Sequence, residues 1–338
     1  MNFFVACPKG TVFLKSIDAS TNVKDAHLIF TLLADVVEEV GVVNVVQVIM
    51  ENAINYVTTG RLLCAKYATI FWTPCAAHCI DLILEDIGKL EWVQDVVQEC
   101  KKITKYIYNH SWVLNLMREF TQGELSRPAV TRFATNFLSL QSLLYEYQAL
   151  RIMFCSQQWV FWKDSTKPEA LSVKAFVFGD SLWDKVTEIV SFTEPLVKVL
   201  RLMDGEKPPM GYIYEGMDRA KEAIKTFYKG DESKYLPLWQ IIDSKWDRQL
   251  HSPLHAAGAY LNPSLFYNEG SNIQRDPEVM RGVMICIEKM FPDVDIQDKI
   301  NLQRDMYKEA SSMFGFSSSQ HLKDKKMSFK CKLLELSL

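Results

Sequence analysis

The order of hydrophobic and polar positions separates a mixed first part of the chain from a helical remainder. Residues 2–7 and 11–17 are apolar-rich runs on either side of a short segment, Pro8-Lys9-Gly10, which is the pattern of a β-hairpin. Residues 24–40 then carry apolar side chains at helical spacing, with Gly41 placed to end the helix. The chain therefore begins with a predicted hairpin and a helix.

Two further strands are predicted, and each ends on polar residues. Residues 42–50 are almost continuously apolar, as in a strand covered on both faces of a sheet. A helix over 52–67, a short strand over 69–72 and a helix over 74–88 follow. A hairpin followed by alternating strands and helices predicts a mixed α/β sheet.

Beyond residue 88 nearly every segment has a helical pattern. We therefore predict an α/β plus all-α fold, with domains at residues 1–88 (sheet), 89–315 (helical insertion) and 316–338 (a divergent, lysine-rich tail). The predicted helices of the insertion are 91–109, 111–120, 133–155, 180–203, 212–228, 234–249, 252–261, 275–290 and 295–313.

Composition narrows the class of protein. With 48% hydrophobic and 23% charged residues, the chain has the composition of a globular protein. A net charge of −3 gives no general attraction to nucleic acid, so contact with DNA requires a local basic patch. No apolar run reaches the ~18 residues of a membrane span, so no membrane association is expected. The eight irregularly spaced cysteines are expected to be free thiols in a reducing compartment.

Glu51 and Asn52, at the end of the strand predicted over 42–50, have two interpretations. A carboxylate at a strand end is compatible with one ligand of a two-metal site, which needs two or three carboxylates. Alternatively, Glu51 is favoured by the dipole of the next helix and Asn52 caps that helix. The second interpretation is favoured, because such pairs are common at helix starts.

The helix predicted over 74–88 begins with a group of possible metal ligands, Cys75, His78 and Cys79. Two thiols and an imidazole are zinc ligands, but a structural zinc site takes four ligands, and no second pair with convincing spacing occurs. We favour buried thiols with a satisfied histidine. The helical pair His251 and His255 likewise has metal-binding spacing, but the small residues that follow at 256–259 favour close helix packing in the core.

Two basic stretches are candidates for nucleic-acid contact. Residues 127–136 contain Arg127, Thr131 and Arg132, which are suited to grip a phosphate backbone; a helix cap with solvated arginines is an equal alternative. Residues 101–108 form a basic and aromatic helix face, for which ordinary solvation is the favoured interpretation.

Taken in order, five stretches resemble the plant hAT-superfamily transposases and their domesticated relatives, including the uncharacterised domain that precedes their Cys-x-x-His segment. The resemblance covers nearly all of residues 2 to about 318. It implies a ribonuclease-H-like core interrupted by a long helical insertion. The stretches are VVQVIMENAINYV (45–57), WTPCAAHCIDLILEDIG (72–88), NHSWVLNLMREFT (109–121), RPAVTRFATNFLSLQSL (127–143) and SPLHAAGAYLNPSLFY (252–267).

The resemblance also implies a site. In the family, three acids bind two Mg²⁺ or Mn²⁺ ions for DNA strand cleavage and transfer. Glu51 stands at the second acid, usually Asp followed by Asn, and it is one methylene longer. The first acid is expected before residue 1 and the third after the insertion, so the chain is expected to be truncated at both ends.

Other positions carry over from the family motifs. Cys75 and His78 match the Cys-x-x-His segment, and Arg132 with Phe133 matches an arginine–aromatic pair near the cleft or the DNA path. With Arg127, Thr131 and Asn52, they form the candidate DNA-contact set.

The sequence-based hypothesis is a catalytically inactive transposase remnant, nuclear by resemblance and otherwise cytoplasmic. No cofactor is expected in this chain. DNA is a candidate partner, and a homo-oligomer is not expected because the family's dimerisation region follows the insertion. The alternatives are a DNA- or protein-binding module domesticated from a transposase, or a truncated product without a role. A sheet without its first strand is expected to leave a strand edge open.

Overall fold

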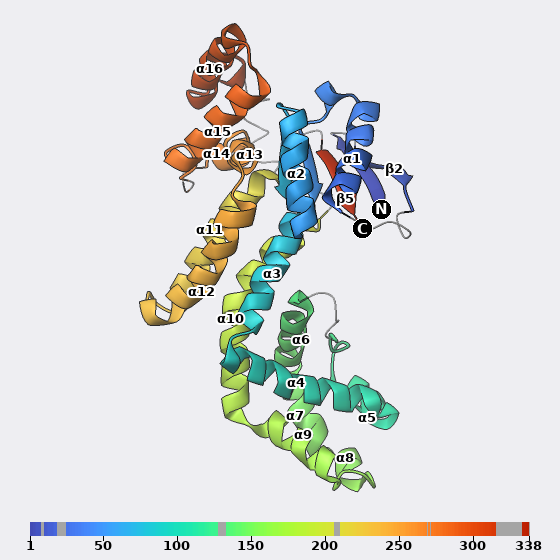
Figure 1. The fold of residues 1–338 in the computed structure, drawn as a ribbon. Coiled ribbons are helices and arrows are strands. Elements are labelled where there is room, and N and C mark those ends of the chain that lie inside the picture. Colours follow the sequence, from blue (N-terminus) through green and yellow to red (C-terminus); the bar gives the residue numbers. More distant parts are fainter. Residues whose placement is uncertain are drawn as a thin grey trace. The chain divides into compact units, whose positions relative to one another are not determined.

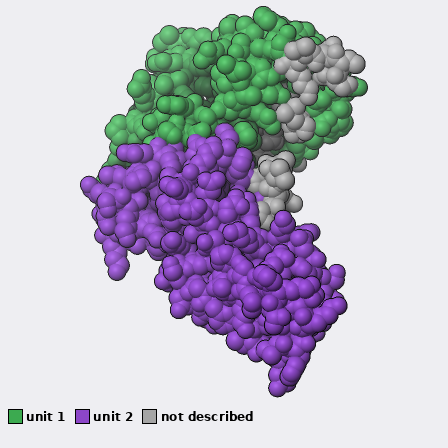
Figure 2. All heavy atoms as spheres, turned by 60° about the horizontal axis from the view of Figure 1, so that its bottom comes forward, with its two compact units in different colours: residues 1–79, 201–219, 243–338 green, residues 80–200, 220–242 purple. Residues whose placement is uncertain are grey.

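A computed structural model describes most of the chain as two compact units. The described residues are 1–7, 10–18, 25–127, 133–205, 210–268, 270, 272–315 and 333–337. Unit 1 comprises residues 1–79, 201–219 and 243–338, and unit 2 comprises residues 80–200 and 220–242. Figure 2 colours the two units, and each is described separately below. Residues 201–219 and 243–315 of the predicted helical insertion thus group with the sheet, whereas residues 220–242 group with the helices that follow residue 88.

Unit 1 contains a five-stranded mixed sheet in the order β2-β1-β5-β3-β4. β1 pairs with β2 and with β5 in antiparallel fashion, whereas β3 pairs with β5 and with β4 in parallel fashion (Figure 1). A mixed sheet was the prediction. The strands are β1 (Asn2–Cys7), β2 (Gly10–Ser16), β3 (Gln47–Met50), β4 (Phe71–Pro74) and β5 (Leu333–Ser337).

The last strand lies within the segment that the sequence presents as a tail. Along β1, Asn2 pairs with Ser337 and Ala6 with Leu333. Along β3, Gln47 pairs with Leu333. The strand edge that was expected to stay open is therefore paired, because β5 joins the β1–β2 hairpin to the β3–β4 pair.

β3 is shorter than the predicted strand over 42–50. A 3₁₀ turn, Val42–Asn44, precedes it. The Asn44 backbone N–H donates to the Gly41 carbonyl, and the Asn44 side-chain amide donates to the Val40 carbonyl. These local bonds compete with strand pairing, which the apolar pattern of the segment did not reveal.

Each face of the β3–β4 pair is covered by different helices. Val48 and Met50 are buried against α1 (Ala26–Val40) and α2 (Ile54–Lys66), which Figure 1 shows beside the sheet. Phe71 points to the opposite face, since successive residues of a strand alternate. There it packs into a second core with α13 (Pro253–Tyr260) and α15 (Pro277–Met290). Parallel strands buried on both faces explain the nearly continuous apolar runs in this part of the sequence.

The second core of unit 1 is closely packed by small residues. A Cβ atom built on Gly211 would lie 2.9 Å from the Gly258 carbonyl oxygen, and one on Gly282 would lie 2.6 Å from the Ala256 Cβ. This confirms the interpretation of residues 256–259 as core. The helical elements here are the start of α11 (Met210–Phe227), the π-helical turn Trp246–Leu250, α13 (Pro253–Tyr260), α14 (Pro263–Phe266), α15 (Pro277–Met290), α16 (Val294–Lys308) and the 3₁₀ turn Ser312–Gly315.

The described part of unit 2 is helical. The predicted helices at 91–109, 111–120 and 180–203 are confirmed to the residue, whereas the predicted helix over 133–155 is broken at Glu146. The helices are α3 (Ala76–Gly88, whose first residues belong to unit 1), α4 (Glu91–Asn109), α5 (Ser111–Phe120), α6 (Ala134–Tyr145), α7 (Tyr147–Cys155), α8 (Gln157–Phe161), α9 (Pro168–Phe178), α10 (Asp180–Met203), the end of α11 and α12 (Glu232–Lys245).

Among the described helices, none is both long enough and apolar enough to cross a membrane.

Candidate functional site at the carboxyl edge of β3 and β4

The parallel pairing of β3 and β4 brings two polar segments to one edge of the sheet. Met50 pairs with Pro74 at the ends of the strands, and the Cys75 N–H continues the ladder by donating to the Met50 carbonyl at 2.7 Å. Glu51 and Cys75 therefore leave the sheet side by side. The sequence-based expectation of two strand ends that present polar side chains is met here.

Glu51 and Asn52 lie in the turn between β3 and α2. The N-cap of α2 is Ala53, which has no side-chain cap, so the interpretation of Asn52 as the capping residue is wrong. Glu51 is half-buried. The pKa of Tyr56 is raised, first by burial and then by the Glu51 charge, so the carboxylate acts on a buried phenol of the first turn of α2.

The cysteine and histidine side chains beside this edge differ in burial. Cys75 and His78 are half-buried, and Cys79 is buried. Burial, followed by the neighbouring Cys75, raises the pKa of the Cys79 thiol to about 12. No group of three or more His, Cys, Asp or Glu side chains suited to a metal ion occurs among the described residues.

A buried polar pair lies just behind the edge, and the sequence analysis missed it. Gln47 is 1% exposed, and its side-chain nitrogen donates to the Thr73 hydroxyl. The Gln47 side-chain oxygen is buried and has no hydrogen-bond partner among the described residues. The available signal was the amide of Gln47 inside an apolar strand, because buried polar side chains usually have a hydrogen-bond partner.

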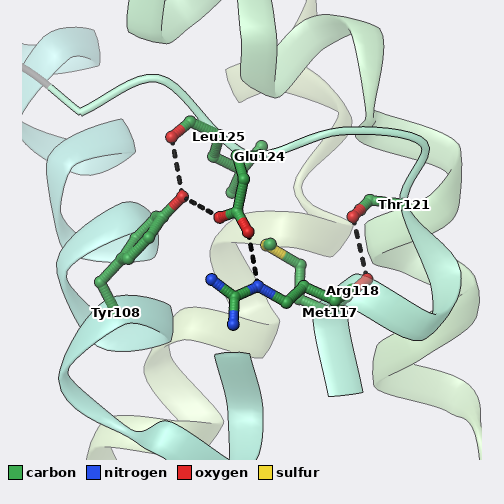
Figure 3. Close-up of polar contacts among 6 residues, drawn as sticks. All are labelled: Tyr108, Met117, Arg118, Thr121, Glu124 and Leu125. Carbon is green, nitrogen blue, oxygen red and sulfur yellow. Dashed lines mark hydrogen bonds and ion pairs between the residues drawn. The ribbon is translucent and has the colours of Figure 1, made fainter. Parts of the chain in front are cut away.

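Arg127 is located on unit 2, where it stacks on an aromatic ring. Its guanidinium carbon lies 4.8 Å from the centroid of Tyr108, on α4. Figure 3 shows the surrounding contacts: Arg118 Nε donates to Glu124 at 2.5 Å, and the Tyr108 hydroxyl lies 2.8 Å from the other Glu124 oxygen and 2.9 Å from the Leu125 carbonyl. The Glu124 carboxylate therefore accepts hydrogen bonds from one arginine, Arg118, and from the Tyr108 phenol.

This arrangement determines the electrostatics around Arg118, Glu124 and Arg127, which are called the arginine corner below. The hydrogen bond from Arg118 is the main cause of a lowered Glu124 pKa, and Arg127 contributes weakly through its charge. Burial, and then Glu124, raises the pKa of Tyr108 to about 12. Because Glu124 neutralises one of the two guanidiniums, the arginine corner keeps a single net positive charge for an anionic partner.

Phe133 marks the start of α6, and its neighbours in the motif lie outside the described residues. The Phe133 and Ala134 N–H groups donate to the Asp81 carboxylate, at 3.3 and 2.8 Å. Asp81, from α3, thus caps α6, and sequence reasoning missed it; an acid within the apolar run CIDLIL was the signal. Thr131 and Arg132 are among the residues that the structure does not describe.

The histidine pair does not form a joint site. His255 is buried, its Nδ1 lies 2.7 Å from the Leu250 carbonyl, and burial lowers its pKa to about 4. His251 is exposed, and its Nδ1 lies 2.8 Å from a Glu278 oxygen. The two side chains have separate partners, in keeping with the core interpretation of His255.

Comparison with known families identifies one match. Residues 1–103 match the family model described as "Domain of unknown function (DUF659)", a domain found in hAT-type transposase-like proteins. The matched range contains four of the sheet strands, α1 to α3 and most of α4, together with Glu51, Cys75 and His78. A search of curated proteins finds no match to this chain.

Proposed function

We propose that this chain is derived from a plant hAT transposase, retains a ribonuclease-H-like scaffold and does not catalyse DNA strand transfer. The DUF659 match over residues 1–103 supports the transposase origin. The proposal places the protein in the nucleus.

The sheet order supports the ribonuclease-H-like assignment. β1 and β2 stand as the second and third strands of such a core, and β3 and β4 as the fourth and fifth. We assign the position between β1 and β3 to the core's opening strand, which β5 occupies with antiparallel pairing to β1 and parallel pairing to β3. The carboxyl edge of β3 then corresponds to the metal-binding edge of an active relative.

The side chains at that edge are the observation on which the loss of chemistry rests. Glu51 follows β3 where the family has Asp, and the residues beside it are an amide, Asn52, and a thiol, Cys75. Two-metal phosphoryl transfer needs several carboxylates placed within about half an ångström. Among the side chains that the structure describes at this edge, one carboxylate longer than Asp lies beside neutral groups, which is ill suited to hold two Mg²⁺ ions.

Nicking of supercoiled DNA tests this proposal. The purified chain is incubated with Mg²⁺ or Mn²⁺, alongside Glu51→Ala and the matched control Asp95→Ala, which removes an exposed acid from α4. We expect all three proteins to give the same background. Metal-dependent nicking that Asp95→Ala retains and Glu51→Ala loses would overturn the proposal.

A second candidate function, a DNA-binding module, is favoured by the arginine corner. An exposed guanidinium stacked on Tyr108 combines a phosphate-binding group with an aromatic surface. If the module binds DNA there, labelled duplex and single-stranded oligonucleotides bind in a salt-dependent manner, and Arg127→Ala weakens binding and lowers the salt slope by about one.

The control for DNA binding is Lys185→Ala, which removes an exposed cation elsewhere on unit 2. An Arg127→Ala/Arg132→Ala double variant extends the test to the adjacent motif. Equal losses in the Lys185 and Arg127 variants indicate unspecific attraction, and no binding at low salt excludes the DNA-binding alternative.

A further inference from the structure

Unit 1 contains an apolar hollow that neither the proposed chemistry nor DNA binding uses. It has a volume of about 410 Å³ and lies among α11, α13, α15 and α16, with Val46 beside β3 in its wall. This volume lies within the range typical of small-molecule sites. The apolar lining includes Met210, Leu254, Val283, Ile287, Ile300 and Phe314.

One cation stands in the wall of this hollow. Arg304, on α16, is half-buried, and its Nη1 donates to the Met284 sulfur at 2.8 Å. Among the described residues, its guanidinium has no carboxylate partner. A thioether is a weak acceptor for a charged donor, so most of the hydrogen-bonding capacity of Arg304 is unused.

Two buried phenols in the same wall also lack partners. Tyr260 is 2% exposed and Tyr307 is 7% exposed, and neither hydroxyl has a hydrogen-bond partner among the described residues. Burial raises the pKa of Tyr260, and the positive charge of Arg304 partly opposes this rise; the charge of the exposed Asp305 has a smaller effect in the upward direction. The guanidinium and this phenol therefore act on each other. Burying an unbonded hydroxyl is unfavourable, and a bound hydrogen-bond acceptor would relieve that cost.

We propose that this hollow binds a small amphipathic carboxylate, with its apolar body among the helices and its head group at Arg304. The apolar wall selects a hydrocarbon body, and Arg304 selects a single negative charge. The hydroxyls of Tyr260 and Tyr307, which line the same hollow, supply further donors. A phosphate monoester would bring a second negative charge, and the described residues that line the hollow offer no cation besides Arg304 to balance it.

Titration calorimetry with three probes of equal chain length tests this site. Dodecanoate, dodecanol and dodecyltrimethylammonium are each titrated into the full chain below their micellar concentrations. We expect saturable one-to-one binding of dodecanoate, weaker binding of dodecanol and the weakest binding of the cation. Equal affinities for the three probes, or no saturable binding of dodecanoate, would overturn the proposal.

Variants of α16 separate the head-group contact from the apolar contact. Arg304→Met is expected to weaken dodecanoate binding about tenfold, the loss of roughly one charge-assisted contact, and to leave dodecanol binding unchanged. The matched control Lys299→Met removes an exposed cation of α16 outside the hollow and is expected to change neither affinity. Loss of dodecanoate affinity in both variants, or in neither, contradicts the assignment of Arg304.

A third variant tests the hollow itself. Ile300→Trp places an indole in the wall of the hollow. It is expected to lower the affinities for dodecanoate and dodecanol equally, and the helical circular dichroism spectrum should be unchanged. If that spectrum is lost, Tyr307→Phe serves instead, because it leaves the packing volume in place. The Tyr307→Phe variant is expected to bind dodecanoate about threefold or more weakly, because a hydrogen bond is removed, and to bind dodecanol with unchanged affinity. Unchanged dodecanoate binding in both variants contradicts the site.

Discussion

Gly60 of α2 lies against the indole of Trp72 in β4 at a distance that leaves no room for a side chain. A Cβ atom on residue 60 would lie 2.2 Å from Trp72 Cδ2 and 2.4 Å from Cγ. The Trp72 side chain faces the core formed with α1 and α2, since the residue alternates with Phe71 and Thr73 along the strand. This contact lets α2 approach β4, and it thereby fixes the turn that carries Glu51.

We expect Gly60→Ala to lower the free energy of unfolding by roughly 1–3 kcal/mol, because the methyl group has to displace the partly buried Trp72 ring. Urea denaturation measures the loss, with Gly88→Ala as the control; the nearest atom to a Cβ there is Phe137 Cζ at 3.8 Å, an ordinary contact. Adding Trp72→Leu to Gly60→Ala should recover part of the stability, as expected for a pair in contact. Strictly additive losses would contradict the close approach.

β5 gives a second prediction, because it joins the β1–β2 hairpin to the β3–β4 pair. Removal of residues 333–338 should speed amide exchange in β1 and β3 and leave α10 unchanged. Unpaired strand edges promote association, so the shortened chain should also aggregate more readily. Unchanged exchange in β1 and β3 would show that this strand does not hold the sheet together.

The buried His255 predicts a loss of stability in acid. Its pKa is lowered to about 4 in the folded chain, mainly by burial, from an ordinary value of about 6.5. The unfolded chain therefore takes up a proton that the folded chain refuses. This contribution is fully present above about pH 6.5 and falls by up to about 1.4 kcal/mol per pH unit toward pH 4.

Urea titrations between pH 4 and 7 check this dependence. His255→Asn keeps a donor near the Leu250 carbonyl without the titration, so its stability profile should be flatter over that range. His27→Gln, which removes an exposed imidazole from α1, serves as the control. Equal slopes in all three proteins would exclude His255 as the cause.

The Asp81 carboxylate is expected to stabilise the first turn of α6. Asp81→Ala removes the acceptor for the Phe133 and Ala134 N–H groups and should cost about 1 kcal/mol, whereas Asp81→Asn, which keeps one oxygen, should cost less. Thermal melting compares the stability losses of the two variants, and amide exchange shows whether the first turn of α6 is the part that is destabilised. A loss that is equal in both variants would point to the charge alone.

The sequence by itself determined the elements whose signal is local. Helical spacing of apolar residues fixes 91–109, 111–120 and 180–203 to the residue, and two apolar runs that end in polar groups indicate the edge with Glu51 and Cys75. Periodicity and stop residues act within a few positions along the chain, so they can be read without a fold.

Only the tertiary structure decided which distant residues meet. The pairing of β5 with β1 joins residues more than 320 positions apart, and Asp81 reaches α6 from a helix more than 50 positions earlier. The space left out at Gly60 and the hollow beside Arg304 likewise depend on how helices pack. No local pattern encodes these contacts, because packing depends on the volumes and faces of several elements at once.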